Sequence, residues 1–345
     1  MASLLLYKEG DATREAFRVE SSTLHIERNG LSLKPVVTPP RGLLIGTLEL
    51  LLADSPIIIP KRFFTIRVDG EARVVRVPVE EIEDVYRDYH TGNEANKFLA
   101  ALIDQTNGVI QSLSGGPIWR RYERFSRAFY DAMLRLEQLN RQLELKQLEV
   151  LMQEFNNYHL IRYGRFHFGT PLPPQVTVGG GKQESVLRKE KGEVICSEGE
   201  AFNGLYILLQ GTVIIQKGKR VLGTIDKEGE AFGELSLFLE EKRTASVIAK
   251  ERSSFLWVTK EQLPTFHKQH PLLFYELART LSRRVLNNLE EIEEVRWITS
   301  QASEILLKSE KDQFIKKLQG FLRTLEDGEI SEVVGALVYS LLEFR

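Results

Sequence analysis

The sequence is poor in cysteine and in long apolar runs. Cys196 is the only cysteine among 345 residues, so no disulfide can form within one chain, which suits a reducing compartment. The N-terminal stretch MASLLLYKEGD holds an apolar run of four residues, too short for a signal peptide. No window approaches the roughly 20 apolar residues that a membrane helix needs. These absences predict a cytoplasmic protein that does not insert into membranes.

Patterns that carry catalysis or bind metals are also missing. The six histidines are scattered, and no His, Cys and acidic residues share a metal-binding spacing. The run GGGK at 179–182 lacks the spacing of a phosphate loop, and Gln183 stands where that loop needs Ser or Thr. Neither a kinase glycine loop nor a nucleophile elbow is present. We therefore expect no enzyme, no catalytic residues, no metal and no cofactor.

The segment from Ser185 to Val258 has the glycine spacing of a compact β-domain. Short β-rich runs such as GLYILLQG, TVIIQKG and SFLWV lie between glycines that recur at short intervals. Regular short strands joined by glycine turns are typical of a sandwich, a barrel or a jelly roll. We place this β-domain at residues 183–260.

The N-terminal part repeats this pattern. With the sequence shifted by 189 positions, Glu9–Gly30 falls on Glu198–Lys219 without a gap. Two further blocks match, IGTLELL with FGELSLF and, after a longer loop, KRFFTIRV with KRTASVIA. Order and apolar pattern persist across the three blocks, so residues 1–90 are predicted to be a second copy of the same β-domain.

Helical patterns fill most of the remaining chain. Residues 91–168 are a predicted helical connector, residues 169–182 a linker rich in Pro and Gly, and residues 261–345 a set of C-terminal helices. From Ile118 to about Tyr158 there is no Pro or Gly, and apolar residues repeat every seven positions over about three heptads. Two interpretations remain open: one long helix packed on the rest of the chain, or a short coiled coil in a homodimer.

The stretch AFGELSLFLEEKRTASVIA, residues 231–249, combines features of a phosphate site. Gly233 allows close backbone approach, and the first N–H groups of the helical turn after it suit an anion. Ten residues later Arg243 adds a charged, two-pronged donor, the natural partner of a phosphate. Glu234 would repel that phosphate, so its carboxylate suits a hydroxyl group. A cyclised ribose phosphate presents both groups side by side.

This stretch resembles the phosphate-binding cassette of the cyclic-nucleotide-binding domains found in bacterial catabolite activator proteins, protein-kinase regulatory subunits and ligand-gated channels. The spaced EG…YILLQGTVII resembles the upstream strands of that family. The resemblance implies that Glu234 meets the ribose 2′-hydroxyl and Arg243 the phosphate. It implies a ligand-binding set of Gly233, Glu234, Leu235, Ser236, Arg243, Thr244 and Ala245. The alternative is a ligand-free copy in which Glu234 and Arg243 pair with each other.

The identity of the base is left open. The resemblance implies that the ligand is cAMP or cGMP, because a threonine at position 244 is compatible with guanine and also occurs in domains that take both nucleotides. The base should be capped from the helix that follows the β-domain. Candidates are Arg284, Asn287 and Asn288, which could equally form the solvated face of that helix.

The first copy departs from the cassette where a ligand would bind. Thr47 replaces the ribose-binding acid, the loop before Arg62 is longer, and Phe63-Phe64 replaces Thr-Ala. Two phenyl rings are expected to fill its pocket. We therefore expect this copy to have lost cyclic-nucleotide binding and to serve as a scaffold or an interface.

Together these patterns predict an α+β multidomain fold. It has two β-roll (jelly-roll-like) domains of the cyclic-nucleotide-binding type, a long helical segment between them and a helical C-terminus. The favoured function is a non-enzymatic cyclic-nucleotide receptor that signals to a protein effector by rearranging its helices. Alternatives are a transcription regulator of the catabolite activator type and a structural adaptor without ligand. DNA binding is not favoured, because the net charge is −2 and residues 308–330 carry five cations against five acids.

Overall fold

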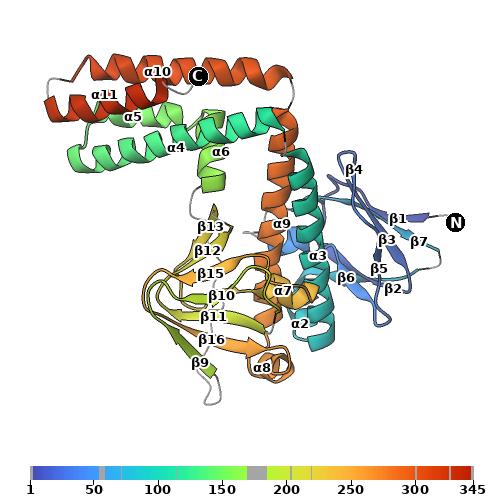
Figure 1. Cartoon of the computed structure of the whole chain (residues 1–345). Helices are drawn as coiled ribbons and strands as arrows, with labels where there is room; N and C mark the ends of the chain where they lie inside the picture. The colour runs from blue at the N-terminus through green and yellow to red at the C-terminus, as the bar shows by residue number, and fades with distance from the viewer. Residues whose placement is uncertain are drawn as a thin grey trace. The chain divides into compact units, whose positions relative to one another are not determined.

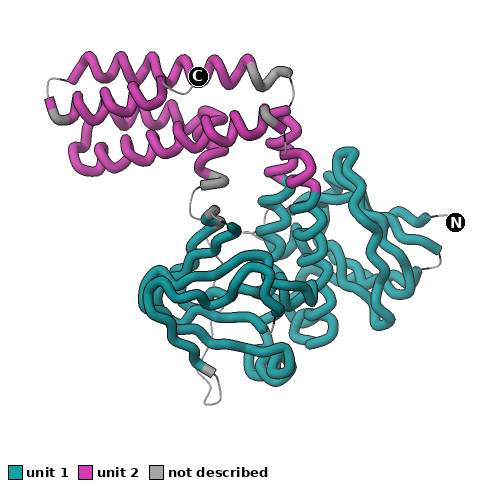
Figure 2. Tube along the Cα trace, viewed as in Figure 1, with its two compact units in different colours: residues 1–108, 172–289 teal, residues 109–171, 290–345 magenta. Residues whose placement is uncertain are grey.

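The computed structural model describes residues 3–53, 59–70, 72–114, 116–168, 185–202, 204–218, 220–299, 301–325 and 328–342. The predicted linker at 169–182 lies outside the described residues. The chain divides into two compact units (Figure 2): unit 1 comprises residues 1–108 and 172–289, and unit 2 comprises residues 109–171 and 290–345. These units cut across the predicted segments, because α3 (Tyr89–Leu113) and α9 (Leu273–Ile298) each contribute to both.

Unit 1 contains two β-modules (Figure 1). The first β-module, residues 3–78, has one sheet of order β1-β7-β3-β4, in which β5 also pairs with β3, and a second sheet of order β6-β2-β8. Its short helix α1 (Leu48–Leu51) follows β6 in the chain. The strands are β1 (Ser3–Tyr7), β2 (Glu15–Glu20), β3 (Thr23–Arg28), β4 (Leu31–Ser32), β5 (Val36–Val37), β6 (Leu43–Ile45), β7 (Thr65–Asp69) and β8 (Arg73–Pro78).

The second β-module, residues 185–259, has the same arrangement except that β9 has no counterpart in the first module and β5 has none in the second. One sheet has the order β10-β15-β12-β13 and the other β14-β11-β16-β9. Its short helix α7 (Glu234–Leu239) follows β14. The strands are β9 (Ser185–Lys189), β10 (Val194–Cys196), β11 (Gly204–Gln210), β12 (Val213–Lys217), β13 (Arg220–Ile225), β14 (Ala231–Phe232), β15 (Ser246–Ala249) and β16 (Ser253–Thr259).

Strand register also agrees between the two modules. Tyr7 pairs with Ile66 in the first module, and Cys196, 189 positions after Tyr7, pairs with Val247 in the second. Phe17 opposite Ile45 likewise corresponds to Tyr206 opposite Phe232. A one-residue slip would move every core side chain to the solvent face, so equal register means equal inward-facing positions. The repeat in the sequence therefore corresponds to one backbone arrangement present twice.

The inward positions carry large apolar side chains, which hold the two sheets of each module together. In the second module Tyr206 and Phe232 of one sheet, whose rings stack at 5.1 Å, share a core with Val213 and Val247 of the other sheet. In the first module Val19 and Leu24 are completely buried. Such alternation of buried and exposed residues is why these short runs form strands.

Hydrogen bonds join α3 and α9 within unit 1. The other helices are the 3-10 turn η1 (Val79–Glu81), α2 (Ile82–Tyr86) and α8 (Leu263–Gln269). The side-chain amide of Asn96 on α3 donates to the Phe274 carbonyl on α9 at 2.9 Å. Further along, the Asn288 amide donates to the Thr106 hydroxyl at 2.9 Å. The two helices thus lie side by side, with Leu281 and Val285 completely buried.

Unit 2 is helical and corrects the coiled-coil interpretation. Its helices are α4 (Pro117–Leu143), α5 (Lys146–Phe155), α6 (His159–Phe168), α10 (Gln301–Leu322) and α11 (Gly328–Leu342), with the ends of α3 and α9. One continuous helix from 118 to 158 is wrong, because Glu144 takes a left-handed conformation with φ 49° and ends α4.

Part of the predicted heptad seam packs against other helices of the same chain. Phe129 and Leu136, two of its residues, are completely buried in the core of unit 2, where Phe129 meets Phe314 at 5.0 Å. Val150, further along the same seam, is 67% exposed. Aromatic residues at seam positions fit such a multi-helix core, whereas a two-helix coiled coil favours Leu, Ile and Val. The predicted homodimer stays a prediction.

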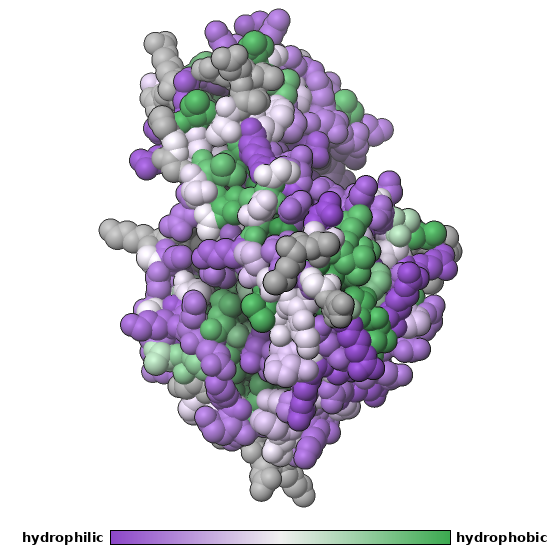
Figure 3. Space-filling view, turned by 90° about the vertical axis from the view of Figure 1, so that its right-hand side faces the viewer, coloured by the Kyte–Doolittle hydropathy of each residue, from purple (hydrophilic) through white to green (hydrophobic). Residues whose placement is uncertain are grey.

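Within the described ranges, no helix has the length and apolar character that crossing a bilayer requires. The face in Figure 3 shows small hydrophobic areas between hydrophilic ones. Exposed large apolar side chains occur in both units, among them Val37, Ile305 and Tyr339. Such residues are normal for protein surfaces and identify no partner.

Candidate functional site

The second β-module has a cavity of about 70 Å³ at its cassette. All seven residues of the predicted ligand-binding set line it, together with Arg284 from α9. The remaining lining residues form apolar walls: Cys196, Ile215, Phe232 and Val247. The structure therefore brings the predicted residues together, and their role in binding stays a prediction.

Arg243 is held in this cavity by backbone carbonyls. Its Nη1 donates to the Gly233 carbonyl at 2.9 Å and its Nη2 to the Gly204 carbonyl at 2.7 Å. The Tyr206 ring lies against the guanidinium at 5.3 Å from its centroid. With 4% exposure, this cation is fixed in orientation before any ligand arrives. Such preorganisation lowers the cost of binding an anion.

Gly233 is required by geometry at the start of the cassette. It takes φ +80°, a left-handed conformation that L side chains rarely adopt. A Cβ at this position would lie 2.4 Å from Arg243 Nη1. Only glycine therefore lets the backbone turn into α7 and still accept the hydrogen bond from Arg243.

Two buried carboxylates flank Gly233 in the sequence, and of these Glu234 lines the cavity. Glu234 is 1% exposed and pairs with Arg284. Glu230, three residues before Gly233, is 6% exposed, and among the described residues its Oε2 accepts no hydrogen bond. Burial raises the pKa of Glu230 to about 8, against the opposing effect of the Arg284 charge. In the structure the ion-pair partner of Glu234 is Arg284, on α9, and whether this copy binds a ligand stays a prediction.

Of the three candidate base-capping residues, only Arg284 lines the cavity. Arg284 reaches the cavity through Glu234. Asn287 does not line it. The Asn288 amide is engaged with α3, donating to Thr106 and to the Asn107 side chain at 2.9 Å each. Asn288 therefore joins α9 to α3. The sequence around Asn288 did not indicate this contact.

Sequence reasoning missed the apolar wall of the cavity. Cys196 on β10 and Val247 on β15 are register partners, and both line the site. Burial raises the pKa of the Cys196 thiol, so this lone cysteine remains a neutral packing residue. The structure shows the same relation in the first module, where Tyr7, 189 positions before Cys196, lies against Arg62 at 4.2 Å.

The equivalent place in the first module is filled by its own side chains. Arg62, the counterpart of Arg243, is 3% exposed and pairs with the Glu49 carboxylate at 3.3 Å. Phe64 is buried at the position of Ala245, as the sequence suggested. Phe63, by contrast, is only partly buried, and its ring lies against Arg28 at 6.0 Å. Of the two rings expected to fill the pocket, only Phe64 is buried, and its filling of the pocket stays a prediction.

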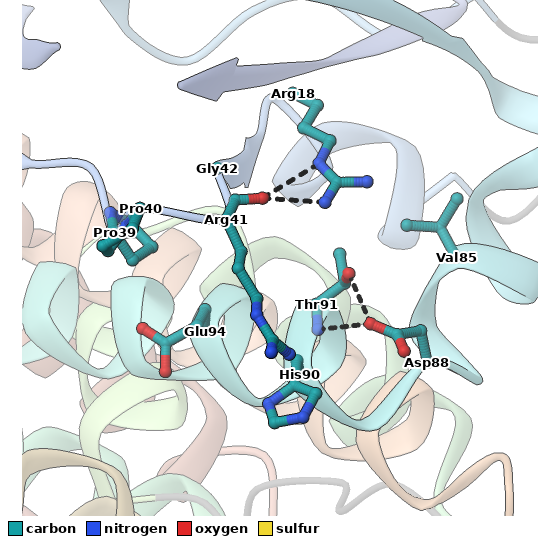
Figure 4. A pocket seen from close by; sticks show the side chains of 10 residues that line it. All are labelled: Arg18, Pro39, Pro40, Arg41, Gly42, Val85, Asp88, His90, Thr91 and Glu94. Carbon is teal, nitrogen blue, oxygen red and sulfur yellow. Dashed lines mark hydrogen bonds between the residues drawn. The ribbon is translucent and has the colours of Figure 1, made fainter. Parts of the chain in front are cut away.

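A larger cavity of about 760 Å³ lies in the first module beside the start of α3 (Figure 4). Arg18 donates two hydrogen bonds to the Arg41 carbonyl, at 3.2 and 2.7 Å. Asp88 accepts hydrogen bonds from the N–H and hydroxyl of Thr91, which lower the pKa of its carboxyl. Both charge signs line this cavity, so it indicates no class of ligand. No group of three or more His, Cys, Asp or Glu among the described residues could hold a metal ion.

One family model matches a segment that includes most of the second module. Residues 186–270 match the family model of the cyclic nucleotide-binding domain. A lysophospholipase of Lodderomyces elongisporus is 25% identical over 162 residues, 44% of this chain and 11% of that enzyme. The CRP-like cAMP-activated global transcriptional regulator of Mycobacterium tuberculosis is 29% identical over 175 residues, 48% of this chain and 77% of the regulator. The chain therefore spans only a small part of the fungal enzyme.

Some solved structures align with most of the chain. The regulatory domain of Toxoplasma gondii PKA with cAMP is 17% identical, with a TM-score of 0.24, over 79% of this chain and 80% of that one. A TM-score of this size supports no inference. The family match coincides with the module that holds the cassette cavity, and residues 186–270 belong to the cyclic nucleotide-binding domain family.

Proposed function

We propose that this chain is a cyclic-nucleotide receptor that binds cAMP or cGMP in its second β-module and regulates a partner without catalysis of its own. One observation carries the proposal. A buried arginine and a buried carboxylate face one cavity within a segment of the cyclic nucleotide-binding family. A cyclic nucleotide offers a phosphate anion and a ribose hydroxyl close together, which matches this pair of groups.

Each group has one suitable role. The Arg243 guanidinium would hold the cyclic phosphate through charge-assisted hydrogen bonds. The Glu234 carboxylate would accept a hydrogen bond from the ribose 2′-hydroxyl. The cavity of about 70 Å³ is well below the roughly 300–1,000 Å³ of typical ligand pockets. A whole nucleotide exceeds this volume, so in this proposal the phosphate and the ribose edge enter the cavity and the base projects towards α9.

This geometry couples the ligand to α9. Arg284 on α9 pairs with Glu234, so a ribose hydroxyl competes with Arg284 for the same carboxylate. A base beside Arg284 would further require this part of α9 to move. Because Asn96 and Asn288 attach α9 to α3, a shift of one helix strains its contacts with the other. Only contacts that differ between the two states can shift the equilibrium, and the Arg284 pair is such a contact.

The test is calorimetric titration of cAMP and of cGMP into the purified chain. We expect one site per chain and a loss of affinity of about 30-fold or more in Arg243→Ala, since truncating a buried charged partner costs ~2–5 kcal/mol. Arg252→Ala is the matched control, because Arg252 lies in the same module with its side chain 75% exposed. Circular dichroism must show that each variant is folded. Absence of binding by either nucleotide to the wild-type chain would leave a structural adaptor.

We also propose that the first β-module is a copy of the same domain type that binds no cyclic nucleotide. Equal strand order and register support the common type. The filled position next to Arg62 supports the loss of binding. Titration tests this as well, because two sites per chain would contradict it.

A DNA-binding output is the second candidate. The match to the mycobacterial transcriptional regulator covers 175 residues, about twice the length of the 186–270 segment. Against it, residues 308–330 have no net basic charge. Retention on DNA with a steep salt dependence, in the presence of the bound nucleotide, would support this output. No retention even at low salt would exclude it.

A further inference from the structure

We infer that the first β-module contains a phosphate-type anion site that its own Glu49 carboxylate occupies, and that removing this carboxylate opens the site to inorganic phosphate. The inference rests on the proposed role of Arg243 as a phosphate ligand, because it treats Arg62 as the equivalent group. It assigns Glu49 the role of a built-in occupant.

The arginine of the first module is held like that of the second. Arg62 Nη1 donates to the Gly46 carbonyl at 2.6 Å, as Arg243 Nη1 does to Gly233. Arg62 Nη2 donates to the Glu15 carbonyl, as Arg243 Nη2 does to Gly204. In both modules the backbone N–H of the arginine also donates to a carbonyl at 2.8 Å. The acceptor is the residue directly after a Glu-Gly pair, Asp11 in the first module and Glu200 in the second. The two guanidinium groups therefore occupy the same place in the two folds.

Glu49 sits where an anion would meet this arginine. One carboxylate oxygen lies 3.3 Å from Arg62 Nη1, and the other accepts a hydrogen bond from the Phe63 N–H at 2.7 Å. Glu49 and Arg62 are each 3% exposed. The aligned position in the second module is Ser236, whose side chain carries no charge. A carboxylate thus takes the position that stays open beside Arg243.

In the first module Glu49 supplies the counter-charge of the buried Arg62 guanidinium. Removing one partner of a buried ion pair leaves an uncompensated charge in a medium of low dielectric. The rings of Tyr7 and Phe17 lie 4.2 and 5.6 Å from the guanidinium carbon, and they supply only weak cation–π attraction in place of a counter-charge. When Glu49 is absent, an external anion of similar size gains the same two donors.

This arrangement makes the first module insensitive to nucleotide. Its anion position is filled permanently by a covalently attached carboxylate, whose effective concentration exceeds that of any free ligand. The chain then carries two anion positions of which only the second responds to a signal. The first module becomes a fixed support for α2 and α3.

The test measures thermal and urea unfolding of Glu49→Ser at increasing inorganic phosphate, at constant ionic strength. We expect a lowered unfolding midpoint that phosphate raises selectively. At a phosphate concentration ten times the dissociation constant, the unfolding constant should fall about elevenfold. Phosphate also stabilises proteins generally, so the wild-type chain and Glu27→Ser are the controls. Glu27 is an exposed acid in the same module. Both controls retain the cavity of the second β-module, so phosphate binding there would appear in them too.

A second variant keeps the test decisive if Glu49→Ser folds poorly. Glu49→Leu/Arg62→Met replaces both charges by apolar side chains, and it should fold without any selective response to phosphate. Failure of Glu49→Ser to fold at any phosphate concentration, while this double variant folds, would overturn the inference. So would a Glu49→Ser chain as stable as the wild type with no selective response. Cyclic-nucleotide binding by the wild type is measured separately, so failure of the proposed function is distinguishable.

Discussion

The two β-modules share a backbone and differ at the positions that surround one arginine. Arg62 and Arg243 make equivalent hydrogen bonds to backbone carbonyls. In the first module Glu49 neutralises the guanidinium, whereas the second has Ser236 and an open cavity. The difference teaches that a fold supplies the position of the cation, and that a few neighbouring side chains decide whether a ligand can reach it.

Ser236→Glu should give the largest effect, because it transfers the carboxylate of the first module to the second. We expect the new side chain to pair with Arg243 and to lower cyclic-nucleotide affinity about 100-fold or more in calorimetry, with the fold retained. Ser236→Gln is the matched control, since it has the same length without the charge. An equal loss in Ser236→Gln would mean that filled space, rather than charge, separates the modules.

Glu230 should make the second module sensitive to pH where the first is not. Its aligned residue is Leu43, which is buried and apolar. The pKa of Glu230 is raised from 4.5 to about 8, so between these values the folded state binds more protons than the unfolded state. Stability should therefore fall as pH rises from about 5 to 8, by at most ~1.4 kcal/mol per pH unit.

Urea unfolding of the wild type and of Glu230→Gln at pH 5, 6, 7 and 8 checks this sign. The variant should lose this component of the pH dependence, because its amide does not titrate. A wild-type stability that rises over this pH range relative to Glu230→Gln would contradict the prediction.

The glycines that precede α1 and α7 offer a third comparison. A Cβ would lie 2.6 Å from Arg62 Nη1 at Gly46 and 2.4 Å from Arg243 Nη1 at Gly233. Each Gly→Ala change should cost ~1–3 kcal/mol of stability through the left-handed backbone conformation. Only Gly233→Ala should also weaken nucleotide binding, by about tenfold, since it displaces the cavity arginine. Reduced nucleotide affinity in Gly46→Ala would show that the first module contributes to binding.

Thr244→Ala should give the smallest effect. Loss of one hydroxyl hydrogen bond to the ligand costs ~0.5–1.5 kcal/mol, which is about a two- to tenfold loss of affinity. We expect the loss to be greater for cGMP than for cAMP, measured in parallel titrations. Equal losses for both nucleotides would place this hydroxyl against the phosphate instead of the base. Phe63→Thr, the reverse change in the first module, should leave both affinities unaltered.

Much of the β-structure was predictable, and the helical packing was not. Glycine turns and alternating apolar residues mark short strands locally, so the two β-rich regions and their alignment were visible in the sequence. The heptads at 118–158 also gave a correct apolar face on α4. A face does not identify what covers it, and here Phe155 and Phe314 of the same chain stack at 3.9 Å in the core that Phe129 joins.

The sequence by itself determined the strand pattern, the repeat and the cassette, because spacing and residue type encode local backbone geometry. Gly233 and Arg243 could be paired ten residues apart for this reason. Only the tertiary structure decided that Arg284 pairs with Glu234 across 50 residues and that Glu49 pairs with Arg62. Ion pairs of this kind depend on which side chains the fold buries together, and burial, unlike local spacing, is a property of the whole packed chain.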